Sequence, residues 1–197
     1  MKWLFELLVA AIYSLLIQNL IFNSGLSLSE TIRMARRPKF FAMYTITIVY
    51  YTSVTSLVCS LIDLLPKVRA LGTAWHVLIY AAAISVIHLI TCVFVIVVLK
   101  ANKKYMNSLG MCAINSLVLA IPIINNRSAN TVFASLGSGI GAGLAFMLAM
   151  ALINSAMKSI ANNKEIPKPF RGLPAVFIYA AILSLALTCL SGQTLFI

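Results

Sequence analysis

Six long apolar runs constrain what this 197-residue chain can fold into. A helix needs about 20 mostly apolar residues to cross the hydrocarbon core of a bilayer, which is roughly 30 Å thick. The runs lack the period-two alternation of barrel strands, which excludes a closed barrel. The sequence therefore predicts an all-α integral membrane protein, with six transmembrane helices over 3–22, 40–65, 74–99, 106–124, 132–157 and 173–196.

The charge composition excludes a soluble domain. Only 10% of the residues are charged and 61% are hydrophobic, so the chain cannot build the polar shell that a water-soluble fold needs. The net charge of +11 raises the question of a nucleic-acid partner. The basic residues, however, form short clusters between apolar runs, where they suit anionic lipid head groups. We predict one membrane domain over 1–197 and no nucleic-acid partner.

The basic residues also predict an orientation, because Lys and Arg collect in cytoplasmic loops. Three alternate loops hold most of them: Arg33, Arg36, Arg37, Lys39, Lys100, Lys103, Lys104, Lys158, Lys164, Lys168 and Arg171. We therefore expect these loops in the cytoplasm and a multi-pass protein of the cell membrane, with both termini outside.

Six helices divide into two halves of three, about 1–100 and 101–197. An odd number of crossings per half turns the second half upside down, which is the topology of inverted repeats. In such folds, short or interrupted helices at matching positions indicate the functional centre. Helices one and four, the first of each half, are the shortest of the six runs and fit this description.

Polar residues interrupt both of these helices. Gln18 and Asn19 lie in helix one, and Asn115 and Ser116 lie in helix four together with Pro122. Asn19 and Asn115 must find partners within the bilayer. Two interpretations stay open: hydrogen bonds between helices, or the lining of an ion or cofactor path through the midplane that includes Gln18.

Few other residues suggest chemistry. His88 and Cys92 lie one helical turn apart and could bind a metal or haem, but a structural role is the favoured interpretation. Asp63 precedes Lys67 and Arg69, which favours a structural ion pair at the outer end of helix two. No catalytic group can be assembled from the remaining residues, so we expect the chain to have no catalytic residues of its own.

Glycines recur at every second position in helix five. Gly137 with Gly141, and Gly139 with Gly143, are small residues four apart. This spacing allows two backbones to approach closely within a membrane. A nucleotide-binding loop is excluded, because no strand precedes the glycines. We predict close helix packing along this run.

The segment Ile-Pro-Lys-Pro-Phe-Arg-Gly at 166–172 resembles the A subunit of Rnf complexes. The D and E subunits of the sodium-pumping NADH:quinone reductase are relatives of that protein. The resemblance extends to Leu-Ser-Gly at 190–192, Leu-Ile-Asp at 61–63, Gln18-Asn19 and Asn115-Ser116. It implies a six-helix fold of inverted repeats, in agreement with the topology predicted from the apolar runs.

Members of this family use two half-membrane cysteines to share a 2Fe-2S cluster between two homologous subunits. The resemblance places these cysteine positions at Ser29 and Ser116. A hydroxyl is a far poorer ligand for iron than a thiolate, so we expect this chain to lack its own cluster ligands. Cys112, one turn before Ser116, is the one candidate substitute.

The resemblance implies a membrane subunit that couples electron transfer to Na+ or H+ translocation. Its partners would be a homologous inverted subunit, similar to the E subunit of Rnf complexes, together with flavin and iron–sulfur subunits. The alternative is a paralogue without a cluster that acts as a transporter, a channel or an accessory scaffold, since fold does not fix function. Neighbouring genes for flavin and Rnf-like subunits would favour the first hypothesis.

Overall fold

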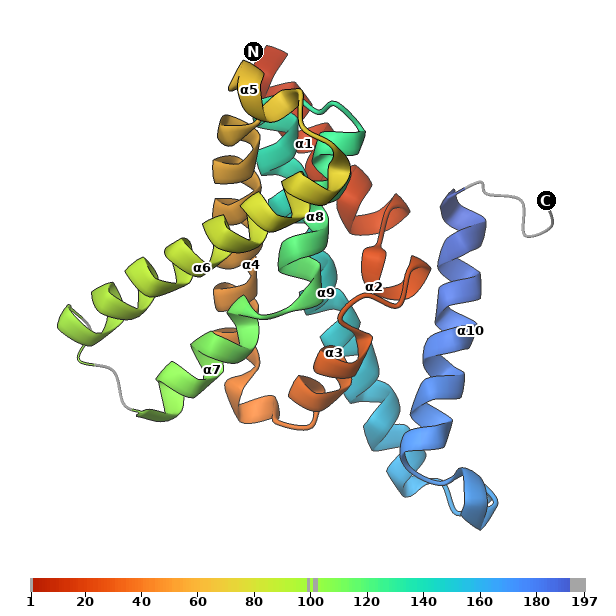
Figure 1. Cartoon of the computed structure of the whole chain (residues 1–197). Helices are drawn as coiled ribbons and strands as arrows, with labels where there is room; N and C mark the ends of the chain where they lie inside the picture. Colours follow the sequence, from red (N-terminus) through yellow and green to blue (C-terminus); the bar gives the residue numbers. More distant parts are fainter. Residues whose placement is uncertain (1, 99, 101–102, 192–197) are drawn as a thin grey trace.

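The computed structural model describes residues 2–98, 100 and 103–191, and within these ranges every regular element is helical (Figure 1). The longer helices are α1 (Lys2–Ile12), α3 (Leu28–Ala35), α4 (Phe41–Ile62), α6 (Thr73–Val97), α7 (Lys103–Ala113), α8 (Ser116–Arg127), α9 (Val132–Asn162) and α10 (Leu173–Ser191). Shorter elements are the π-turn η1 (Tyr13–Ile17), α2 (Leu20–Asn23), α5 (Pro66–Arg69) and the 3-10 turns η2 (Pro38–Phe40) and η3 (Lys168–Phe170).

Five helical segments are long and apolar enough to cross a membrane. They are Lys2–Asn23, Pro38–Ile62, Thr73–Val97, Tyr105–Arg127 and Val132–Asn162. The sixth predicted span is represented by the shorter apolar helix Leu173–Cys189, and residues 192–196 of that prediction lie outside the described residues. The predicted all-helical, multi-pass membrane protein is confirmed, while the sixth crossing stays a prediction.

One face of α9 packs closely against α1. A Cβ atom added at Gly137 would overlap the backbone oxygen of Leu7, and one added at Gly141 would overlap the backbone oxygen of Ala11. These two glycines lie four residues apart, so they form a continuous groove along the helix. The α1 backbone fits into that groove because neither position carries a side chain.

The neighbouring face of α9 packs in the same way against α4. A Cβ atom at Gly139 would lie 2.5 Å from the Thr52 backbone oxygen, and one at Gly143 would lie 2.6 Å from Val49 Cα. Gly137 and Gly141 therefore pack against α1, whereas Gly139 and Gly143 pack against α4. The predicted close packing along this run is confirmed, and α9 becomes the central helix of the bundle.

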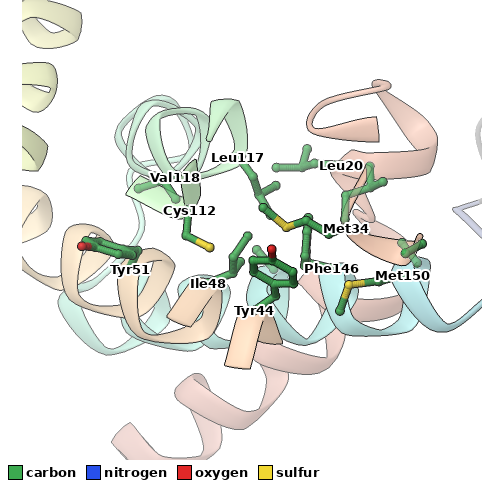
Figure 2. Packing of buried hydrophobic residues seen from close by; sticks show 14 of the residues in the cluster. Leu20, Met34, Tyr44, Ile48, Tyr51, Cys112, Leu117, Val118, Phe146 and Met150 are labelled. Carbon is green, nitrogen blue, oxygen red and sulfur yellow. The ribbon is translucent and has the colours of Figure 1, made fainter. Parts of the chain in front are cut away.

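An apolar cluster fills the space between α4, α9 and the interrupted helices (Figure 2). Its buried members include Leu20, Met34, Tyr44, Ile48, Tyr51, Cys112, Leu117, Val118, Phe146 and Met150. Many large apolar side chains of α1, α6 and α10 are instead exposed. Such an inside-and-outside distribution suits a protein whose outer surface meets lipid.

Candidate functional site at the two helix breaks

The first helix breaks at Gln18 and Asn19. The backbone N–H of Gln18 donates to the backbone oxygen of Tyr13 at 2.8 Å. This bond closes the π-turn and ends the first part of the helix. Asn19 then adopts an extended backbone, and its Oδ1 accepts from the amides of Ile21 at 3.2 Å and Phe22 at 3.4 Å. This completely buried asparagine therefore caps the short helix α2.

The second break repeats this device between α7 and α8. Asn115 has an extended backbone, is buried, and accepts from the Leu117 amide through Oδ1 at 2.9 Å. A side-chain cap matters more here than in water, because an unsatisfied amide in a bilayer costs several kcal/mol. Each buried asparagine thus caps the N-terminus of a helix at a point where the regular backbone hydrogen bonding of the preceding helix has stopped.

The two interrupted helices meet directly. The Ser27 amide, just before α3, donates to Ser116 Oγ at 3.0 Å, and Ser116 is the first residue of α8. Figure 1 shows the break between α7 and α8 lying beside the turn that joins α2 to α3. Ser27 has a left-handed backbone with φ of 62°, a conformation that non-glycine residues adopt at a free-energy cost of about 1–3 kcal/mol.

Two polar atoms at this meeting point have no hydrogen-bond partner within the described ranges. They are the buried Ser27 Oγ and Asn115 Nδ2. The N-terminal ends of α3 and α8 also converge here, and helix N-termini carry a partial positive charge. The site is therefore rich in donors and favours a negative charge over a bound cation.

Ser29 and Cys112 take no part in the hydrogen bond between Ser27 and Ser116. The exposed side chain of Ser29 lines a cavity with Arg33 and Phe177. Cys112 is completely buried in the apolar cluster between Ile48 and Val118 (Figure 2). The Ser116 hydroxyl already accepts a hydrogen bond, so the side chains at this contact do not fit an iron–sulfur cluster.

Comparison with known proteins decides the family. The family described as "Rnf-Nqr subunit, membrane protein" matches residues 7–194. The chain belongs to the Rnf-Nqr family. The A-subunit resemblance drawn from the sequence is thereby confirmed, whereas the replacement of cluster cysteines by Ser29 and Ser116 stays a prediction.

Several curated relatives of this Rnf-Nqr chain are A subunits. In Clostridium ljungdahlii, the A subunit of the proton-translocating ferredoxin:NAD(+) oxidoreductase complex is 37% identical over 42% of each chain. In Buchnera aphidicola, the A subunit of the ion-translocating oxidoreductase complex is 26% identical over 75% of each chain. In Acetobacterium woodii, the A subunit of the Na(+)-translocating ferredoxin:NAD(+) oxidoreductase complex is 25% identical over 64% of this chain and 63% of the relative. The chain thus matches less than two thirds of the length of the first and third relatives.

A second polar cluster of the Rnf-Nqr chain was missed by the sequence analysis. We predicted that Asp63 would pair with Lys67 and Arg69, but its Oδ2 accepts from the Tyr80 hydroxyl at 2.5 Å and from Asn126 Nδ2 at 3.1 Å. The ion-pair prediction was wrong in its partners, because the carboxylate turns toward α6 and α8. The available signals were Tyr80, a polar residue within the run 74–99, and Asn126, two positions after the run 106–124.

Asn125 is the centre of the buried part of this cluster. Its Nδ2 donates to Ser56 Oγ at 2.7 Å, and its Oδ1 accepts from Ser138 Oγ at 2.7 Å and from Asn130 Nδ2 at 3.0 Å. One amide therefore connects α4, α8 and α9. Asn125 and Asp63 both line a cavity of about 180 Å³.

His88 and Cys92 are engaged within the bundle. His88 Nδ1 lies 2.8 Å from the Tyr51 hydroxyl, and Cys92 Sγ lies 3.5 Å from His88 Nε2. Each ring nitrogen therefore already has a neighbour from the chain itself. These contacts favour the structural interpretation of the pair.

Proposed function

We propose that this chain is the A-type membrane subunit of an Rnf/Nqr-type complex that couples electron transfer to Na+ or H+ translocation. The contact between Ser27 and Ser116 is the observation that carries this proposal, because it joins two interrupted helices in the interior of a family member. Broken helices that meet inside a membrane domain form the sites of ion-coupled transport proteins. The relatives also support the proposal, because two of them are named as subunits of a proton-translocating and a Na(+)-translocating ferredoxin:NAD(+) oxidoreductase complex.

In this proposal the chain crosses the membrane six times as two inverted repeats within one domain. The matching asparagine caps at Asn19 and Asn115 support the repeat, since each half begins with an interrupted helix. In Figure 1, the connections after α3 and after α9 lie at the opposite end of the bundle from α5. These two connections carry basic clusters, which supports a cytoplasmic position for them and termini outside.

The chain's own part is to form the membrane core without supplying ligands to a 2Fe-2S cluster. The midplane would then be lined by polar side chains rather than by thiolates: Gln18, Asn19, Asn115 and Ser116. Cys112 contributes to packing. The soluble flavin and iron–sulfur subunits would dock on the basic loops, and a homologous inverted subunit would complete the membrane core.

Purification from native membranes tests this function. We expect a tagged chain in mild detergent to retain a homologous membrane subunit together with flavin and iron–sulfur subunits, identified by mass spectrometry. Iron content and paramagnetic resonance spectra should be the same for the wild-type complex and for Cys112→Ala. A chain that purifies alone, or with a transport ATPase, would instead support the alternative role of transporter, channel or scaffold.

A further inference from the structure

The Asp63 carboxylate has one satisfied and one unsatisfied oxygen. Oδ2 accepts two hydrogen bonds, from Tyr80 and Asn126, whereas Oδ1 is buried and accepts none from the residues that the structure describes. The nearest basic atom to Oδ1 is His76 Nε2, at 3.9 Å. That nitrogen is also buried and has no partner within the same residues. The two side chains are 17% and 6% exposed, so bulk water reaches neither freely.

The other nitrogen of His76 fixes where its proton lies. His76 Nδ1 is 3.2 Å from the backbone oxygen of Gly72, which can only accept a hydrogen bond. Nδ1 must therefore carry a hydrogen. A neutral imidazole has only one N–H, so the lone pair of Nε2 would face the lone pairs of Asp63 Oδ1. Two buried acceptors that face each other in this way are unfavourable, and one additional proton removes the conflict.

We propose that Asp63 and His76 form a proton-binding site, in which His76 carries a hydrogen on both ring nitrogens and its Nε2–H points toward Asp63 Oδ1. The hydrogen bonds from Tyr80 and Asn126 to Oδ2 stabilise the negative carboxylate, as a buried ion pair requires. The role of this proton in translocation rests on the proposed function, whereas its presence between the two side chains does not.

The elements around the pair contribute few other titratable groups. Cys59 lies one turn before Asp63 on α4, and Tyr80 lies one turn after His76 on α6. Arg69, at the end of α5, lines the rim of the cavity that contains Asp63. From α8 and α9 this cavity is lined by amide, hydroxyl and apolar side chains, which do not titrate. Among the described residues that line the cavity, Arg69 is therefore the one basic group beside Asp63.

A second cavity lies beside the first helix break and shares one lining residue with the cavity at Asp63. Asn130 lines the 180 Å³ cavity beside Asp63 and a second cavity of about 460 Å³ that includes Gln18. Asn130 donates to Asn125, and Ser138 of the same network lines the second cavity. Asn130 thus lies between the cavity that Asp63 lines and the cavity that Gln18 and Glu6 line.

Nitrogen-15 NMR of histidine tests the proposal directly, because the chain has only two histidines. The full chain, labelled on histidine and placed in lipid nanodiscs, is measured at about pH 8, where a free imidazole with a pKa of about 6.5 is neutral. His88→Gln removes the second signal and assigns the first. We expect His76 to show two protonated nitrogens in the wild-type chain, and one protonated nitrogen in Asp63→Asn.

A neutral His76 with a bare Nε2 in the wild-type chain at this pH would overturn the proposal, since water would then satisfy the pair. This outcome does not depend on the folding of Asp63→Asn, because the decisive spectrum is that of the wild-type chain, with its signals assigned through His88→Gln. The NMR result is also independent of the purification experiment that tests the proposed function. A chain without redox partners can still hold the proton, and a chain within a complex can lack it.

Discussion

Replacing Gly141 by leucine is expected to abolish the folded protein. A Cβ atom at this position already overlaps the backbone oxygen of Ala11, and backbone cannot rotate aside as a flexible side chain can. Helix α1 would have to leave the groove on α9. Overpacking of a well-packed interior costs about 1–3 kcal/mol even for small additions, so we expect that loss for Gly141→Ala and no monodisperse protein for Gly141→Leu. Fluorescence-detected size-exclusion chromatography shows whether Gly141→Leu gives monodisperse protein, and the thermal midpoint measures the loss of stability in Gly141→Ala.

Gly110 provides the matched control for this prediction. It lies in α7, and a Cβ atom added there would meet nothing within 4 Å. Alanine is the better helix former by roughly 1 kcal/mol, so Gly110→Ala should leave the midpoint unchanged or raise it. Equal midpoints for Gly110→Ala and Gly141→Ala would contradict the close approach of α1 and α9.

Replacing Asn125 by leucine should produce the second large loss of stability. The change removes the donor to Ser56 Oγ and the acceptor that Ser138 Oγ shares with Asn130 Nδ2, and it places an apolar side chain among these polar groups. Both serine hydroxyls keep the Ser135 backbone oxygen as an acceptor, so the network is weakened rather than left entirely without partners. Each buried polar group left unsatisfied costs about 1–3 kcal/mol. We expect the free energy of unfolding to fall by about 2–4 kcal/mol, with faster hydrogen exchange where α4, α8 and α9 meet.

The exposed Asn162, the last residue of α9, is the control for this second variant. Asn162→Leu makes the same chemical change outside the buried network. Its midpoint should stay close to that of the wild-type chain. If Asn125→Leu is equally stable, the network between the three helices does not hold them together.

Local patterns in the sequence predicted much of the fold. The apolar runs located the helices, because span length depends only on bilayer thickness. The spacing of Gly137 and Gly141 predicted a close approach, because residues four apart share a helix face. Polar pairs such as Gln18-Asn19 located the breaks. Helix α3 was missed, since eight residues in a polar loop become helical there by packing against α9.

The site was predicted less completely because its contacts join distant parts of the chain. The resemblance placed the two cysteine positions at Ser29 and Ser116, but it gave no sign that the Ser27 amide would donate to Ser116 Oγ. The partners of Asp63 were missed for the same reason. Tyr80 is 17 positions away and Asn126 is 63 positions away, so only the folded bundle brings them to the carboxylate.

The meeting of the two helix breaks is the central claim, and disulfide formation within the membrane tests it most directly. A hydrogen bond of 3.0 Å between the Ser27 amide and Ser116 Oγ keeps the two Cα atoms close to the roughly 4.4–6.8 Å that a disulfide spans. The pair Ser27→Cys with Ser116→Cys is made in a chain whose native cysteines are replaced by alanine. Oxidation in native membranes, followed by a thiol-labelling gel shift, reports the bond.

The comparison pair is Ser29→Cys with Ser116→Cys, because the exposed Ser29 side chain lines a cavity with Arg33 and Phe177 and makes no hydrogen bond to Ser116 that the structure describes. We expect rapid and nearly complete oxidation for positions 27 and 116, and slower, partial oxidation for positions 29 and 116. Free thiols at both 27 and 116 after oxidation, whatever the second pair does, would contradict the meeting of the two interrupted helices.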